Sequence, residues 1–343
     1  MAGLAGAGLA LAVLGSLAVV YAAKLLRDFN HAGPVSTTVA VLLVLGSLYA
    51  WWPALRAFAS ARQRSALLAE DELVAARRVS AAGRELALIA MGYAATSLIV
   101  ALVLVFVLAN HGGVATTFFA LDPIHSSFHQ VLQGFWTNVW VACVAELLVL
   151  VLGLLIAIVR MLPGKAGAPL RGLAVVFADV FRGIPAIIVI ILIGFGLPLT
   201  GVSQLQHLPL PMLGVIALTL TYTAYVSEVY RAGLASIHPS QSAAARSLGL
   251  GYTQTLRTVL VPQAVRRVVP PLLNDFIGLQ KDTALLSTLA IPESLNNAKL
   301  WEAQLFNLSP ILLAALFFVL ITIPQARLVD YLIERDASRR AGK

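Results

Sequence analysis

The sequence predicts an all-α polytopic membrane protein with about eight transmembrane helices. Hydrophobic residues make up 59% of the 343-residue chain and charged residues only 12%, and several apolar runs are long enough to cross a bilayer. Because Lys and Arg gather at the cytoplasmic ends of spans, we interpret the net charge of +8 as a marker of membrane topology. This composition excludes a soluble globular domain and argues against a nucleic-acid-binding surface.

Three of the predicted spans come before a connection that lacks Lys and Arg. They are Leu4–Ala23, Val35–Trp52 and Leu86–Leu108. The first is expected to be retained and not cleaved as a signal peptide, because no Lys or Arg precedes its apolar run. The arginine-rich segment 56–84 is expected to form a cytoplasmic helix, and the connection Asn110–Gln133 is expected to lie outside.

Two weak site signals fall near this connection. His125 and His129 are four residues apart, so on a helix they could hold a metal ion if a third ligand joined them. No obvious third ligand follows in the sequence, so no metal site is predicted. Cys143, the one cysteine, is expected to be a small core residue.

The fourth and fifth predicted spans, Trp136–Met161 and Leu173–Leu197, carry ionisable residues. Glu146 lies near the middle of the fourth span, where burial is costly, so it is a candidate for a solute pathway; the alternative is a neutral or paired structural glutamate. Asp179 and Arg182 are three residues apart in the fifth span and are expected to form a structural ion pair. Pro185 can loosen the helix beyond them.

The seventh predicted span is unusually polar. The last three spans are Leu213–Val229, Pro271–Leu289 and Ile311–Ala326. In the seventh, Asn274, Lys281 and Asp282 fall on one helical stripe with Gly278, and such a stripe is tolerable in lipid only if it faces protein or water. These three residues and the adjacent Thr283 are therefore candidates for the solute pathway. The alternative is a Lys281–Asp282 pair that only locks helices together.

Between the sixth and seventh spans, the segment Ser240–Pro262 predicts two short helices about a glycine elbow. Pro239 suits a first helical turn, an alanine run continues the helix, and Gly249 suits a left-handed C-cap. A second helix is expected to begin near Thr253 and to be closed by Pro262. A compact basic elbow between spans is a suitable contact for a soluble partner.

This elbow resembles the EAA loop of ATP-binding cassette (ABC) importer permeases. The family pattern falls on Ala243, Ala244, Ala245, Gly249, Val259, Val261 and Pro262, with Ala243 in place of the family's glutamate. Further matches indicate the polar amino acid permeases: Glu228, Arg231, Gln241, Leu248, Gln263, Ala264, Pro270, Pro271, Asn274, Lys281, Asp282 and Thr283. A second family string matches Phe177, Asp179, Phe181, Arg182, Gly183 and Pro185.

The resemblance implies a five-helix permease core in residues 131–335, preceded by an extension, residues 1–130, with three transmembrane helices and a cytoplasmic polar segment. It places the coupling loop near residues 232–265. The residues expected to contact the ATPase are Gln241, Ala243, Ala244, Ala245, Arg246, Leu248, Gly249 and Pro262.

The resemblance also implies a function: a permease subunit that moves an amino acid or related polar solute across the cell membrane. About eight spans and a basic tail after the last one predict that both termini are cytoplasmic. The chain has no Gly-x-x-x-x-Gly-Lys-Ser/Thr phosphate loop, so it is expected to be no enzyme, to hold no cofactor and to rely on separate ABC ATPase subunits. An extracytoplasmic substrate-binding protein and a second permease copy or paralogue are the other expected partners, beside the lipid membrane. The alternatives are a self-sufficient secondary carrier or channel, and a non-transporting sensor.

Overall fold

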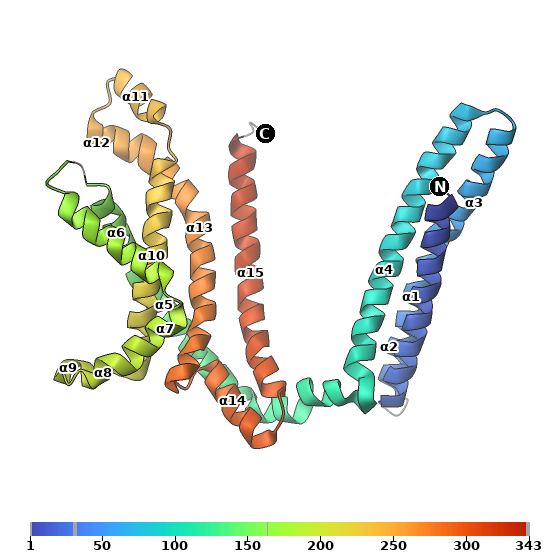
Figure 1. The fold of residues 1–343 in the computed structure, drawn as a ribbon, viewed down its shortest axis with the longest axis horizontal. Coiled ribbons are helices and arrows are strands. Elements are labelled where there is room, and N and C mark those ends of the chain that lie inside the picture. The colour runs from blue at the N-terminus through green and yellow to red at the C-terminus, as the bar shows by residue number, and fades with distance from the viewer. Residues whose placement is uncertain (1, 30–32, 163, 341–343) are drawn as a thin grey trace. The chain divides into compact units, whose positions relative to one another are not determined.

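The structure is a computed structural model that describes residues 2–29, 33–162 and 164–340, and these residues form helices and their connections (Figure 1). Two compact units divide the chain, Met1–Ala120 and Leu121–Lys343. Five helical stretches are long and apolar enough to cross a membrane, or six if one bent pair counts as a span. The all-helical, membrane-spanning fold class is thus confirmed, whereas the number of eight spans stays a prediction.

The first unit is held together by a seam of small residues. Its helices are α1 (Ala2–Phe29), α2 (Pro34–Leu48), α3 (Trp51–Ala69) and α4 (Leu73–Phe118). Along α1, Ala5, Gly8, Ala12 and Gly15 are buried at intervals of three or four residues. A β-carbon on Gly15 would lie 3.0 Å from the main-chain oxygen of Ala94 in α4, so the glycine permits close helix packing.

One expectation for this part of the chain was wrong. The polar segment 56–84 is not a single helix: it is shared by the end of α3 and the start of α4, which turn about Glu70 and Asp71. The connection Asn110–Gln133 is largely helical, because α4 continues to Phe118 after a break at 109–112 and α5 (Leu121–Arg160) follows at once, and its external location stays a prediction. Asn110 and His111 adopt positive φ at that break, which interrupts the helix.

The second unit packs its helices around a contiguous apolar core. The helices are α5, α6 (Ala168–Gly183), α7 (Ala186–Ile191), α8 (Leu197–Leu199), α9 (Ser203–Gln206), α10 (Leu210–Ala235), α11 (Pro239–Ser247), α12 (Tyr252–Thr255), α13 (Val261–Asp282), α14 (Ser294–Leu305) and α15 (Ser309–Arg340). Core side chains from α5, α7, α10 and the segment after α13 include Val149, Ile190, Leu218 and Leu286, all fully buried. Helix α10 runs from the end that holds α9 to the end that holds α11 (Figure 1).

The fifth predicted span is a broken helix, not a continuous one. Helices α6 and α7 are bent by 104° at the residues between them. Ile184 is extended, with φ −96° and ψ 130°, because the ring of Pro185 disfavours helical geometry in the residue before it. The break places the carboxyl end of α6 and the start of α7 beside α10.

Helix α13 begins earlier than the sequence pattern suggested. Pro262 does not close the second elbow helix; it lies in the first turn of α13, where a missing N–H costs nothing. A π-helical segment, Leu256–Leu260, joins α12 to α13. Beyond Asp282 the chain tightens into a 3₁₀ segment, Thr283–Leu289, which then leads to α14.

Candidate functional site

The elbow between α10 and α13 turns on a single glycine. Gly249 has φ +83°, and it directly follows Leu248, the C-cap of α11. The N–H of Leu250 donates to the main-chain oxygen of Ala245 at 3.2 Å, and the N–H of Gly249 donates to that of Arg246 at 3.0 Å. These two bonds form a Schellman motif, which requires a left-handed residue at the position of Gly249.

Side chains link the elbow to α13, and α13 to the end of α10. The Gln263 amide of α13 donates to the Gln241 side-chain oxygen of α11 at 3.3 Å. Arg267 of α13 donates to the main-chain oxygen of Ser236, just past the end of α10, and to the Ser236 hydroxyl at 2.8 Å. Movement of α11 would therefore be passed to both α10 and α13.

The outer face of α11 is built from small residues with a protruding leucine. Ala243, Ala244 and Arg246 are exposed, and the Leu248 side chain is 83% exposed. Ala245 points inward and is buried. Small residues permit close approach, and an exposed leucine at a loop tip is suited to insertion into a groove of a partner.

A polar cavity of about 460 Å³ opens at the break between α6 and α7. Its walls come from α6, α7, α10 and α13, and they include two predicted residues of the polar stripe, Asn274 and Asp282, together with Gly278 between them. The remaining lining residues are Arg182, Gly183, Ile184, Pro185, Ala186, Thr221, Tyr222, Tyr225 and Asp275.

Two carboxylates dominate the charge of this cavity. The Tyr222 hydroxyl donates to Oδ2 of Asp282 at 2.9 Å. Oδ2 of Asp275 is buried and has no hydrogen-bond partner among the described residues. The sequence pattern did not single out Asp275 as a pathway candidate, although it is next to Asn274 on the same helix.

The cavity's guanidinium is already engaged by protein groups. Arg182 donates through Nη2 to Asp179 at 2.9 Å and through Nε to the main-chain oxygen of Ala178 at 3.3 Å. Its Nη1 lies 3.9 Å from Oε2 of Glu228. The Asp179–Arg182 pair expected from the sequence is present, and it belongs to a larger network.

Glu228 of α10 is the centre of that network. Arg160, at the end of α5, donates to its Oε2 at 2.7 Å, and Arg231 donates to its Oε1. With Arg182, the network joins α5, α6 and α10 beneath the cavity. No local sequence pattern pairs Arg160 with Glu228, because 68 residues separate them.

Three other predicted pathway residues do not line the cavity. Lys281 is exposed, whereas Asp282 faces the cavity, since adjacent residues on a helix point about 100° apart. Thr283 is fully buried and accepts a hydrogen bond from the Asn138 amide at 3.0 Å. Glu146 is half-buried in α5, and its Oε2 has no hydrogen-bond partner among the described residues.

A buried polar cluster joins α5 to α14 and was not predicted. Asn138 donates to Glu293 at 3.0 Å and accepts from the main-chain N–H of Ser294 at 3.0 Å. Glu293 caps α14, because its carboxylate accepts from the N–H groups of the first turn. Burial raises the pKa of the Glu293 carboxyl, and these hydrogen bonds oppose that effect.

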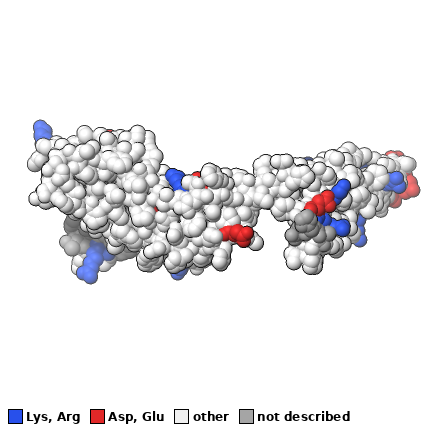
Figure 2. Space-filling view, turned by 90° about the horizontal axis from the view of Figure 1, so that it is seen from below, with Lys and Arg blue, Asp and Glu red and all other residues white. Residues whose placement is uncertain are grey.

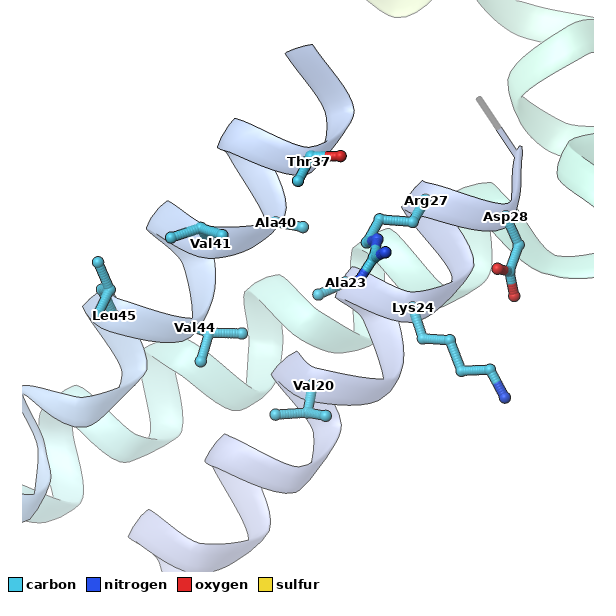
Figure 3. A pocket seen from close by; sticks show the side chains of 10 residues that line it. All are labelled: Val20, Ala23, Lys24, Arg27, Asp28, Thr37, Ala40, Val41, Val44 and Leu45. Atoms are coloured by element: carbon cyan, nitrogen blue, oxygen red, sulfur yellow. The ribbon is translucent and has the colours of Figure 1, made fainter. Parts of the chain in front are cut away.

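A second hollow, of about 530 Å³, lies between α1 and α2 in the first unit (Figure 3). Its walls are mainly aliphatic, with Val20, Val41 and Val44 among them. Figure 3 shows the Arg27 side chain on the side of α2 and the Lys24 side chain pointing away from it. Because aliphatic walls suit hydrocarbon, this hollow is a poor site for a polar solute.

The structure supports no site at the histidine pair or at Cys143 within the described residues. His125 and His129 are exposed on α5, and within residues 2–29, 33–162 and 164–340 no group of three potential metal ligands forms. Cys143 is exposed and not buried as expected, because it faces outward from α5. On the face shown in Figure 2 charged side chains are sparse and scattered.

Comparisons with known proteins cover mainly the second unit. Residues 151–336 match the family described as "Binding-protein-dependent transport system inner membrane component". The probable glutamine ABC transporter permease protein GlnP of Bacillus subtilis is 38% identical over 173 residues, 50% of this chain and 76% of the relative. The glutamate/aspartate import permease protein GltK of Escherichia coli O157:H7 is 30% identical over 225 residues, 64% of this chain and 99% of the relative.

A solved structure has the same fold. The crystal structure of an amino acid ABC transporter with histidines is matched with a TM-score of 0.56 and 27% sequence identity, over 62% of this chain and 96% of that one.

Proposed function

Because the chain belongs to the family of binding-protein-dependent transport system inner membrane components, we propose that it is the permease subunit of an ABC importer for an amino acid or a related polar solute. Proteins of this family are transport proteins and not enzymes. They are multi-pass proteins of the plasma membrane and work with ATPase and substrate-binding partners. The observation that carries the proposal is the glycine-hinged elbow, which a side-chain hydrogen bond links to α13, with α13 in turn bonded to the end of α10.

The elbow is the proposed contact with the ATPase. Its contact residues are Gln241, Ala243, Ala244, Ala245, Arg246, Leu248, Gly249 and Pro262. Ala245 and Gly249 would act by shaping the loop, since Ala245 is buried and Gly249 forms its cap. The exposed Leu248 supplies the apolar contact, and Arg246 supplies a charge. Alanine at position 243 favours the helix but offers no carboxylate to the partner.

The solute pathway is proposed to run along the polar face of α13. Asn274 and Asp282 line the cavity at the broken helix, and discontinuous helices commonly form binding sites in transporters. Glu146 would lie behind this face on α5, where its Oε2 is buried without a hydrogen-bond partner among the described residues. Lys281 would serve the pathway from the exposed side of α13, and Thr283 would hold the end of the helix.

The domain arrangement and orientation complete the proposal. Residues 131–335 would form the transport core, and residues 1–130 an extension outside it. The basic segment 56–84 and the elbow would both lie in the cytoplasm, as would both termini. A second permease copy or paralogue would complete the translocation pathway, and an extracytoplasmic binding protein would deliver the solute.

A measurement of which energy source drives uptake tests this function. The complex of permease, ATPase and binding protein is placed in liposomes, and uptake of radiolabelled amino acids is measured either with ATP and a protonophore, or with a proton gradient and no ATP. We expect uptake only with ATP. Uptake driven by the proton gradient alone would identify a secondary carrier, and failure of both conditions for all twenty amino acids would exclude amino acid import.

A further inference from the structure

We propose that the cavity at the α6–α7 break selects solutes that carry an extra positive charge, such as lysine or arginine, over neutral and acidic amino acids. This inference rests on the proposed function and names its substrate class. It is carried by the charges that line the cavity: the carboxylates of Asp275 and Asp282 and the guanidinium of Arg182.

The two carboxylates of the cavity, Asp275 and Asp282, are suited to bind a cation. Oδ2 of Asp275 is buried without a hydrogen-bond partner in the described part of the chain. Asp282 accepts the Tyr222 hydroxyl, a neutral donor that leaves its negative charge in place. A buried carboxylate oxygen without a partner is costly, and an ammonium or guanidinium group of a solute would remove that cost.

The charge of the guanidinium, in contrast, is already offset by nearby protein carboxylates. All three nitrogens of Arg182 face protein oxygens, on Asp179, Ala178 and Glu228. The lining of the cavity carries one guanidinium, that of Arg182, and two carboxylates, those of Asp275 and Asp282, so its formal charge is negative.

Main-chain groups at the break add to the same preference. The carboxyl end of α6, at Arg182 and Gly183, lines the cavity, and the negative end of a helix dipole favours cations. The start of α7, at Ala186, lines the cavity as well, so the main chain favours a cation only on the α6 side. The exposed Asn274 amide can donate to the α-carboxylate that every amino acid carries, so the cavity can accept the backbone of the solute while its carboxylates select the side chain.

Binding without the substrate-binding protein tests this proposal, because that protein has a specificity of its own. The permease–ATPase complex in lipid nanodiscs is titrated with lysine, arginine, glutamine and glutamate. We expect lysine and arginine to bind about tenfold or more tightly than glutamine, and glutamate to bind most weakly. Glutamine or glutamate binding as tightly as lysine, or no binding of any of the four, would overturn the proposal.

Two charge-neutralising variants locate the effect. Asp275→Asn should weaken lysine binding about tenfold or more while it leaves glutamine binding within about twofold. Asp330→Asn is the matched control, since it removes a carboxylate from an exposed ion pair on α15 and should change neither affinity. Equal lysine affinity in Asp275→Asn and wild type would contradict the assignment. If the whole complex imports glutamine or glutamate with ATP but binds lysine weakly, the proposed function stands and only this inference fails.

Discussion

Replacement of Gly249 is expected to perturb the elbow without perturbing the rest of the fold. Its φ of +83° is left-handed, and a β-carbon placed on it would meet nothing within 4 Å. A side chain here therefore causes no clash, and only the backbone penalty remains, about 1–2 kcal/mol for a residue forced into the left-handed region. For Gly249→Val this penalty falls on the Schellman cap alone, so the elbow should change shape while the transmembrane core keeps its stability.

The assay compares two rates in liposomes that hold the whole complex. We expect Gly249→Val to lower ATP-driven uptake about tenfold, as a penalty of about 1.4 kcal/mol in the docked state corresponds to that factor. ATP hydrolysis should fall less than uptake, or binding of the ATPase should weaken. The melting temperature of the purified chain should stay near that of the wild type.

Two further variants serve as controls for the elbow. Gly249→Asn should retain most of the uptake, because asparagine tolerates left-handed geometry better than valine. Gly251→Ala should be nearly neutral, since Gly251 does not have positive φ and its β-carbon would approach only the Gln254 side chain, at 3.6 Å. Wild-type uptake by Gly249→Val would refute the role of the elbow, and so would equal losses in Gly249→Val and Gly251→Ala.

Two other glycines should respond in opposite directions to alanine. A β-carbon on Gly134 would lie 2.5 Å from the main-chain carbon of Glu293, so Gly134→Ala must push α5 and α14 apart and should destabilise the purified protein by about 1–3 kcal/mol. Gly92 in α4 has nothing within 4 Å, so Gly92→Ala should stabilise by about 0.5–1 kcal/mol. Thermal unfolding in detergent measures both, and a stable Gly134→Ala variant would show that this packing is wrong.

Features set by neighbouring residues could be predicted from the sequence. The cap at Gly249 depends on the alanine-rich helix before it, and the stripe of Asn274, Gly278 and Asp282 depends on helical periodicity alone. Lys281 illustrates a limit of the same argument. A stripe that includes two consecutive residues is broad, and only packing against α10 decides which of them faces the cavity.

Features that depend on distant residues could not be predicted. Arg160 meets Glu228 across 68 residues, and Asn138 meets Glu293 across 155. Neither contact leaves a local pattern. Pro185 was expected to loosen its helix, but the sharp bend that creates the cavity depends on the packing of α7 against α10, which no spacing reveals.

The central claim is that ATP hydrolysis acts on this chain through the elbow, and photo-crosslinking tests it most directly. The photoreactive residue p-benzoylphenylalanine is placed at Leu248 or, as control, at Leu199, which is equally exposed at 84% but belongs to α8, near the other end of α10. The account predicts a crosslinked product of permease and ATPase from position 248 and none from position 199. A product from position 199 alone, or none from 248 in an intact complex that imports its solute, would contradict it.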